Sequence, residues 1–243
     1  MQSIVRASSD RRRAAEPTRV RTPILYDGER HEYGPSEIGK QRSRAAKRGM
    51  DVAVASALIL LLMPFHAAVA LLVRLDGGPV LFRHERIGRG GRPFVCYKFR
   101  TMGVDAEASL ARLLTENPCA QAEWLASQKL RDDPRVTRIG RWLRRTSLDE
   151  LPQLLNVLRG DMSLVGPRPV VRDELARYGA EIPHYLRERP GLTGLWQVSG
   201  RNDLTYEDRV RLDGWYLRNK TLVGDLKILV RTCWIVIHGR GAR

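Results

Sequence analysis

Two neighbouring carboxylates, Asp149 and Glu150, lie in residues 144–153, between a pair of arginines and an apolar helical pattern. A Gly-Pro-Arg-Pro segment follows at residues 166–169. Two such side chains can hold a hard cation such as Mg²⁺, or one can attack phosphorus while the other positions the metal. Nearby arginines can hold phosphate oxygens. The grouping therefore indicates phosphate chemistry.

A purely structural interpretation competes with this one. Ser147 and Glu150 have the Ser-x-x-Glu spacing of a capping box, and Pro152 suits the first turn of a helix. Acidic residues near a helix start are also favoured by the helix dipole. Neighbours on a regular helix point about 100° apart, so both carboxylates reach one ligand only in an irregular turn or with a metal between them. The local pattern leaves both interpretations open.

Several basic side chains are candidates for holding phosphate. Lys98 and Arg100 share one face of a predicted strand by the two-residue period, where they meet either an anion or solvent. Arg145 ends a basic run that precedes the acidic pair, although a charge run is usually a solvated face. Arg168 lies between two prolines, whose fixed φ angles reduce the entropy lost when a guanidinium binds phosphate. A rigid connector is the alternative for this last segment.

Residues 52–73 form a stretch of 22 residues without Asp, Glu, Lys or Arg, long enough to cross a bilayer core. Arginines and lysines flank both ends, so the positive-inside rule assigns both ends to the cytoplasm. Pro64 lies near the middle, where it removes a backbone hydrogen bond and favours a break into two short helices. We therefore expect a re-entrant hairpin, with His66 meeting the interrupted backbone. A buried core helix and a kinked single span are the alternatives.

The composition indicates an anionic partner. Forty-two Lys and Arg residues against 27 Asp and Glu give a formal charge of +15 and a pI near 10.5. Basic residues beside the apolar stretch favour an anionic lipid membrane, and the sequence has no nucleic-acid-binding signature. We expect no nucleic acid partner. The three cysteines are far apart, which fits a reducing compartment and argues against zinc.

The expected fold class is α+β, mainly helical and membrane-associated. Residues 1–40 are expected to form a mobile basic cytoplasmic tail rather than a signal peptide. Residues 41–78 would carry the basic flank and the membrane hairpin, and residues 79–243 a cytoplasmic catalytic domain. Within that domain we expect a β-hairpin at 80–87 and 94–102, helices at 106–114 and 121–130, and a helix stopped by Gly160.

Apolar spacing also predicts which helical residues pack inward. Ile139, Trp142 and Leu143 are expected to do so, as are Leu154, Leu155 and Leu158. Near the C-terminus an apolar stripe predicts an amphipathic helix that lies in the membrane interface or packs on the domain, with the interface favoured. The stripe comprises Leu222, Leu226, Leu229, Val230, Cys233, Trp234 and Ile237.

Many ordered motifs together resemble the bacterial sugar transferases, the monotopic phosphoglycosyl transferases, over roughly residues 45 to 240. The longer members that start exopolysaccharide or O-antigen repeat units share the last motif. The motifs are Lys47-Arg48-x-x-Asp51, the proline-broken apolar stretch, Arg74-Leu75-Asp76, Tyr97 to Met102, Ser147 to Gln153, Asn156 to Ser163, Gly166 to Pro169 and Pro190 to Arg201. No long apolar segments precede residue 45, so we expect a compact, hairpin-only form.

The resemblance implies transfer of sugar-1-phosphate, with galactose favoured over glucose, from a UDP-sugar to undecaprenyl phosphate with release of UMP. By analogy Asp149 is the nucleophile, and Glu150 and Mg²⁺ lie against the diphosphate. Arg168, Arg145 and Lys98 would hold phosphate oxygens, and Arg100 and Arg201 complete the candidate substrate-binding set.

The implied location is the bacterial inner membrane, with the active site facing the cytoplasm. Met63 departs from the usual small or polar residue before the proline and cannot donate to freed carbonyls, so we expect the break to rely on His66 or another segment. A homodimer is left open. The competing class is a basic membrane-surface or nucleic-acid-binding protein without catalysis.

Overall fold

The computed structural model describes residues 37–127, 130, 132–200 and 203–238. Most of these residues are helical, with two small two-stranded sheets. The described chain is therefore α+β and mainly helical, as predicted. The expected tail at residues 1–40 lies outside the described residues, apart from its last four, which begin the first helix.

The apolar stretch is divided between two helices, α1 (Glu37–Leu61) and α2 (Met63–Leu75). The axes bend by 64° at Leu62, and among the described helices none is by itself long and apolar enough to cross a membrane. The predicted break is confirmed, but it lies just before Pro64, which occupies the first turn of α2, where its missing N–H costs nothing. The first helix is also longer than expected, at 25 residues.

His66 supports the break, as the sequence suggested. Its ring Nδ1 lies 2.7 Å from the carbonyl oxygen of Leu62, and its backbone N–H donates to the same oxygen at 2.8 Å. The Leu62 carbonyl at the bend therefore accepts a backbone hydrogen bond and also contacts the histidine ring.

The β-hairpin consists of β1 (Leu81–Ile87) and β2 (Pro93–Phe99), paired antiparallel with Leu81 opposite Phe99. Its turn contains a short 3₁₀ helix, η1 (Arg89–Gly91), in which Gly90 has a φ of 71°. The hairpin is confirmed, but β2 ends three residues earlier than expected. Met102 instead forms an isolated bridge with Val136.

One apolar cluster joins α2 to the remainder of the described chain. Leu143 of α5 (Arg138–Thr146) packs with Val69 and Val73 of α2 and Phe99 of β2. Ile139 packs against this cluster, as expected. The prediction for Trp142 was wrong, because its side chain is 45% exposed and contacts only the edge of the cluster through Phe65.

A second region surrounds α6 (Gln153–Arg159), which Gly160 ends at a φ of 88°, as predicted. Leu154 of this helix is buried, but Leu155 is 41% exposed, so its assignment to the core was wrong. After α6 the chain forms β3 (Ser163–Val165), which pairs in parallel with β4 (Gly191–Thr193). No pattern in the sequence predicted this second sheet.

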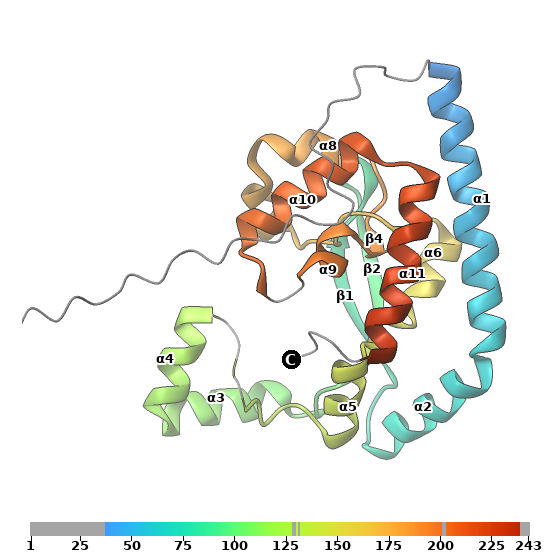
Figure 1. The fold of residues 1–243 in the computed structure, drawn as a ribbon. Helices are drawn as coiled ribbons and strands as arrows, with labels where there is room; N and C mark the ends of the chain where they lie inside the picture. The colour runs from blue at the N-terminus through green and yellow to red at the C-terminus, as the bar shows by residue number, and fades with distance from the viewer. Residues whose placement is uncertain (1–36, 128–129, 131, 201–202, 239–243) are drawn as a thin grey trace, which may run out of the picture. The chain divides into compact units, whose positions relative to one another are not determined.

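Short helices complete the architecture (Figure 1). The predicted pair of helices is present, with the break at Asn117, but the second helix begins three residues earlier than expected and does not have a distinct apolar face. The remaining elements are α3 (Ala106–Glu116), α4 (Pro118–Ser127), η2 (Leu148–Glu150), α7 (Arg172–Leu175), η3 (Ala176–Glu181), α8 (Ile182–Leu186), α9 (Leu195–Ser199), α10 (Tyr206–Asn219) and α11 (Leu222–His238).

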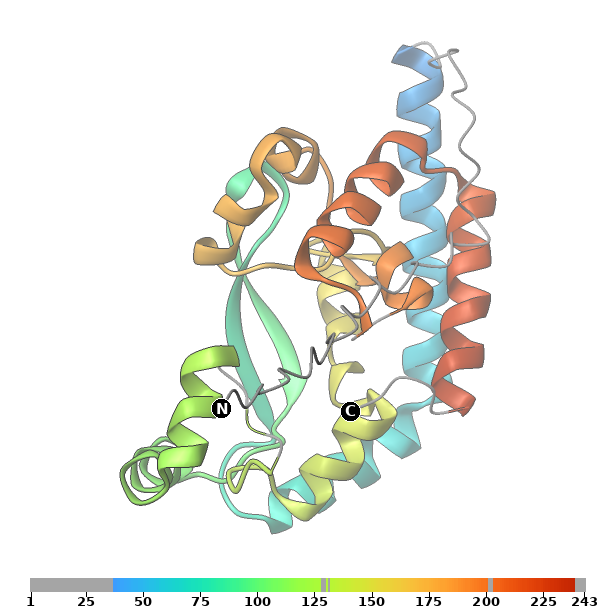
Figure 2. The ribbon, with the colours of Figure 1, turned by 60° about the vertical axis from the view of Figure 1, so that its left-hand side comes forward.

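The C-terminal helix α11 runs beside α1 in both ribbon views (Figures 1 and 2). It packs through Asp225, Ile228 and Ile235, which are buried. The opposite side presents most of the predicted apolar stripe, and Val230 and Trp234 are 65% and 45% exposed. The helix therefore both packs on the domain and leaves an apolar face uncovered by the described residues.

Candidate functional site

The acidic pair lies in an irregular turn. Ser147 ends α5 in the left-handed conformation, with a φ of 58°, and the 3₁₀ helix η2 follows at once. An N-cap residue normally has extended backbone, and the Ser147 side chain makes no capping hydrogen bond, so the capping-box alternative does not describe this turn. The irregular turn that two converging carboxylates require is present.

Both carboxylates converge on one ammonium group. Lys98 Nζ lies 2.6 Å from Glu150 Oε1 and 3.8 Å from Asp149 Oδ2. The lysine comes from β2, which packs against η2, so the β-hairpin positions the cation and the turn positions the acids. Arg168 Nη1 lies 3.8 Å from the same Glu150 oxygen. The structure thus brings together four of the residues selected from the sequence.

Asp149 is the more buried acid, and burial raises its pKa from 3.8 to about 6. The charge of Lys98 opposes this shift, Glu150 adds to it, and Arg144 opposes it. The raised pKa leaves the carboxylate mostly ionised at neutral pH yet poorly solvated. A poorly solvated carboxylate with one long contact to its cation is suited to act on a substrate.

Three other residues that were predicted to bind substrate are not found with this group. Arg100 follows the end of β2, so the strand alternation does not extend to it, and its Nη2 donates to the Val73 carbonyl at 3.0 Å. It is buried against the end of α2, away from the acidic pair. Arg145 is exposed. Its neighbour Arg144 acts electrostatically on Asp149 and donates to Thr101 Oγ1 at 2.9 Å. Arg201 lies outside the described residues.

The loop that carries Arg168 is held by its backbone. Gly166 N–H donates to the Thr193 carbonyl at 2.9 Å, and Gly191 N–H donates to the Pro167 carbonyl at 2.7 Å. The loop approaches β4 so closely that a Cβ on Gly166 would lie 2.7 Å from the Arg189 carbonyl oxygen. A larger residue at Gly166 would displace the loop and its arginine.

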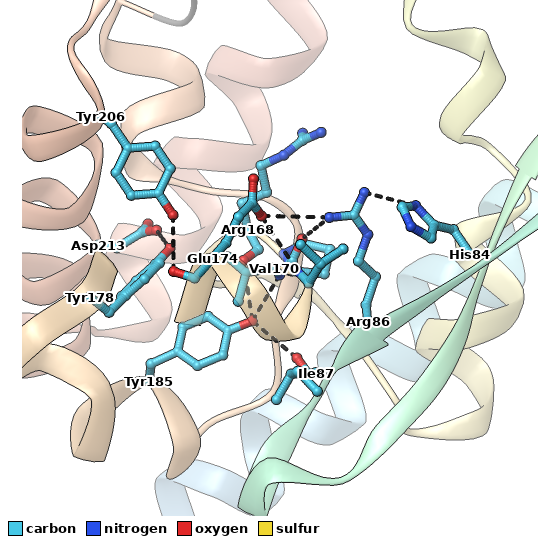
Figure 3. Close-up of polar contacts among 12 residues, drawn as sticks. His84, Arg86, Ile87, Arg168, Val170, Glu174, Tyr178, Tyr185, Tyr206 and Asp213 are labelled. Atoms are coloured by element: carbon cyan, nitrogen blue, oxygen red, sulfur yellow. Dashed lines mark hydrogen bonds and ion pairs between the residues drawn. The ribbon is translucent and has the colours of Figure 1, made fainter. Parts of the chain in front are cut away.

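Tyrosine hydroxyl groups fix the other side of this loop (Figure 3). Tyr185 accepts from the Val170 N–H at 3.2 Å and donates to the Ile87 carbonyl at 3.0 Å, with the Arg168 carbonyl at 3.3 Å. Arg86 reaches the Pro169 carbonyl at 3.4 Å. These contacts tie the loop to the β-hairpin that carries Lys98, so Lys98 and Arg168 are fixed in one frame.

Behind this loop lies a fully buried acid that sequence reasoning missed. Asp213 of α10 accepts a hydrogen bond from the Tyr178 hydroxyl at 2.9 Å. Burial raises its pKa to about 8, against smaller opposing effects of Tyr178 and of the Arg168 backbone and charge. Arg86, Tyr185 and Asp213 carry no sequence signal of their own, because only the chain fold brings them to the Arg168 loop.

A small pocket opens where these elements meet. It is lined by Arg86, Cys96, Lys98, Glu150, Gln153, Arg168, Pro169, Gly191, Leu192 and Gln197. Among the described residues no three His, Cys, Asp or Glu side chains are grouped to hold a metal. Mg²⁺ commonly uses only one or two carboxylates and takes its other ligands from water and substrate phosphate, so the acidic pair fits this ion. Lys98 would then share Glu150 with the metal.

Glu150, Lys98 and Arg168 line one pocket, and Asp149 adjoins it through Lys98, an arrangement that suits phosphate compounds. The comparison with known protein families identifies the class of protein. The family described as Bacterial sugar transferase matches residues 42–239, and the chain belongs to that family.

Several individual members of known function or name are similar to this chain. The chain is 48% identical over 207 residues to the undecaprenyl-phosphate galactose phosphotransferase of Salmonella typhimurium, covering 85% of this chain and 44% of that protein. It is 50% identical over 211 residues to the exopolysaccharide production protein ExoY of Rhizobium meliloti, covering 86% and 93%. A glucose-1-phosphate transferase of Caulobacter vibrioides is 44% identical over 195 residues, covering 76% and 67%. The chain thus spans less than half the length of the Salmonella relative.

Proposed function

We propose that the protein transfers sugar-1-phosphate, with galactose-1-phosphate favoured, from a UDP-sugar to undecaprenyl phosphate and releases UMP. This reaction would begin an exopolysaccharide or O-antigen repeat unit. The observation that carries the proposal is the convergence of Asp149 and Glu150 on Lys98, with Arg168 at the same oxygen. The names of the relatives support the acceptor and the class of donor.

In the first chemical step Asp149 is the nucleophile. Its carboxylate oxygen attacks the phosphorus bonded to the sugar, an acyl phosphate bond forms, and the bond to UMP breaks. Arg168 and Lys98 are placed to bind phosphate oxygens, which offsets repulsion between an anionic attacker and an anionic target. The pKa of about 6 keeps most of this carboxylate ionised at neutral pH.

In the second step an oxygen of undecaprenyl phosphate attacks the same phosphorus. The acyl phosphate bond breaks, the Asp149 carboxylate is restored, and the sugar remains on a lipid diphosphate. Asp149 and Glu150 would hold Mg²⁺, which when bound supplies positive charge to the diphosphate. Lys98, which lies 2.6 Å from Glu150 and 3.8 Å from Asp149, would hold the two acids near one another.

The proposed location is the cytoplasmic face of the bacterial inner membrane. The 64° bend and the contact of His66 with the Leu62 carbonyl at the bend support a hairpin that enters and leaves on one side. Large apolar side chains are exposed along both arms, and Leu61 and Leu75 are 76% and 74% exposed. The uncovered stripe of α11 supports the same surface. A soluble nucleotide sugar and a lipid phosphate can both reach a site held there.

The test is UMP release by the purified protein with Mg²⁺ and undecaprenyl phosphate, using UDP-galactose, UDP-glucose and UDP-N-acetylgalactosamine. We expect one donor, UDP-galactose first, to give UMP release whose continuation beyond one equivalent of protein depends on the lipid acceptor. UMP release from UDP-glucose alone would support the same reaction with glucose as the transferred sugar. If no donor releases UMP, a binding protein without catalysis becomes the better interpretation.

A further inference from the structure

A second, larger pocket lies between α1, the η1 turn and the start of α11. Its cationic lining residues are Arg44, Lys47, Arg48, Arg89, Arg189 and Lys220, against the three acids Asp51, Glu188 and Asp225. Neither acid of the Asp149–Glu150 pair lines it. The pocket therefore carries a net positive charge that the proposed transfer reaction does not use.

Half of these cations are neutralised by carboxylates. Lys47 Nζ lies 2.7 Å from Asp225 Oδ2, and Glu188 Oε1 lies 2.6 Å from Lys220 and 3.4 Å from Arg44. Asp51 Oδ1, the third acid, lies 3.8 Å from Lys47 Nζ, so all three acidic lining residues are paired with these cations. They leave three arginines as the source of the excess charge.

Arg48, Arg89 and Arg189 form no ion pair with any carboxylate in the described part of the chain. Arg48 donates to the carbonyl oxygens of Val157 and Leu158 at 2.6 and 2.9 Å, and Arg189 Nε donates to that of Gly160 at 2.6 Å. Both guanidinium groups thus bind the C-terminal end of α6, where carbonyls lack partners. Partial charges on carbonyls offset only part of two full positive charges.

The three arginines lie near enough to repel one another. A Cβ on Gly160 would lie 3.5 Å from Arg48 Nη2 and 3.9 Å from Arg189 Nη2, so the two guanidinium groups converge on one point. The pKa of Arg189 is lowered, first by burial and then by the charges of Arg48 and Arg89. The charges of Asp51 and Glu188 oppose this shift, but both acids are paired with other cations of the pocket, so a bound anion would stabilise the positive charge that remains in excess.

The position of the pocket limits which anion can reach it. Arg48 precedes residue 52, where the apolar stretch begins, by about one helical turn. Gly166 and Pro167 line this pocket, whereas Arg168 and Pro169 line the one with Glu150. Neighbouring residues of one loop thus line the two pockets, and this one is also lined by the charged residues of α1 that precede the apolar stretch.

We propose that Arg48, Arg89 and Arg189 form a second phosphate-binding site, whose ligand is the headgroup phosphate of an anionic phospholipid. Guanidinium groups present donors in a planar fork that matches phosphate oxygens. A phosphodiester at this level would also fix how deeply α1 enters the lipid. Free inorganic phosphate has the same chemistry and is the alternative source.

The experiment uses the full chain in an uncharged detergent. Calorimetric titrations measure the binding of dihexanoyl-phosphatidylglycerol, dihexanoyl-phosphatidylcholine and inorganic phosphate. The variant is Arg89→Gln with Arg189→Gln, and the matched control is Arg83→Gln, an exposed arginine on β1 that does not line the pocket. Arg89→Gln alone serves if the double variant unfolds, because Arg89 is exposed.

We expect saturable binding of phosphatidylglycerol that weakens at least about tenfold in the double variant and is unchanged in the control, since each charge-assisted hydrogen bond is worth about that factor. Binding of inorganic phosphate with the same arginine dependence and no preference for the lipid would keep the site and change the source. Absence of saturable binding to any anion, or equal binding by wild type and variants, overturns the proposal.

Discussion

Two clusters in this protein have the same composition, one lysine and two carboxylates, and different surroundings. In one, Lys98 meets Asp149 and Glu150 at a pocket. In the other, Lys47 meets Asp225 at 2.7 Å and Asp51 at 3.8 Å between α1 and α11. The comparison separates acids that hold the fold together from acids that are placed to react.

The difference lies in burial and in the donors supplied by the protein. Asp51 accepts from the Leu164 N–H at 3.1 Å, and Asp225 accepts from the Tyr216 hydroxyl at 2.7 Å. Their side chains are 2% and 1% exposed, whereas those of Asp149 and Glu150 are 13% and 21% exposed. Acids saturated by backbone and tyrosine donors are structural, and a partly open acid at a long distance from its lysine can meet a substrate.

The largest expected difference between the clusters is in catalysis. We predict that Asp149→Asn lowers UMP release by about 10³-fold or more, because the nucleophile is lost. Its thermal unfolding should be unchanged or improved, since the variant removes a poorly solvated charge. Asp225→Asn is the matched control, which should retain release per folded molecule and lose stability. Equal loss of activity in both variants would contradict the distinction between the reactive acid Asp149 and the structural acid Asp225.

The second difference is in stability. We predict that Lys47→Met lowers the free energy of unfolding by about 3–5 kcal/mol, because Asp225 is left buried without its cation. Lys98→Met should cost much less, since its two acids are closer to solvent. Urea unfolding of both variants measures this contrast. A larger loss for Lys98→Met would show that the reactive cluster also holds the fold together.

The pH dependence of the transfer step sharpens the assignment of Asp149. Its pKa is raised to about 6, so the ionised form is lost as the pH falls through that value. We predict that kcat/KM falls about tenfold per pH unit below pH 6. Lys98 lowers this pKa, so Lys98→Met should move the acid limb to higher pH. If the acid limb of the pH profile does not move in Lys98→Met, a group other than Asp149 is responsible for it.

The smallest effect concerns the two arginines selected from the sequence. Arg168 reaches Glu150 in the pocket, whereas Arg145 is exposed on α5. We predict that Arg168→Lys lowers kcat/KM about tenfold through loss of one charge-assisted contact, and that Arg145→Lys changes it little. Steady-state kinetics with the identified donor measures both. The reverse order would indicate that Arg145 moves to the substrate in the complex.

Sequence patterns predicted the elements better than their partners. The break near Pro64, the β-hairpin and the stop at Gly160 depend on local backbone rules, and the structure contains all three. Trp142 and Leu155 were assigned to the core wrongly, because apolar spacing marks a helix face without saying whether another element covers it.

In the candidate site, too, the sequence identified residues without showing how the fold brings them together. The sequence identified Asp149, Glu150, Lys98 and Arg168, but their convergence depends on the left-handed Ser147, a conformation that serine seldom adopts. Arg100 was misplaced because the strand ended one residue earlier than the alternation required. Asp213 was missed because its partners come from distant parts of the chain, and only the fold brings them together.

The most direct test of the account is a single-turnover reaction of the purified protein with Mg²⁺ and the identified UDP-sugar, without undecaprenyl phosphate. The account predicts a burst of UMP close to one equivalent of protein, and an intact mass increased by one phosphosugar that peptide mapping places on Asp149. Adding undecaprenyl phosphate should remove the adduct. If UMP appears only when the lipid is present and no adduct forms, the donor and acceptor react directly and Asp149 is not the nucleophile.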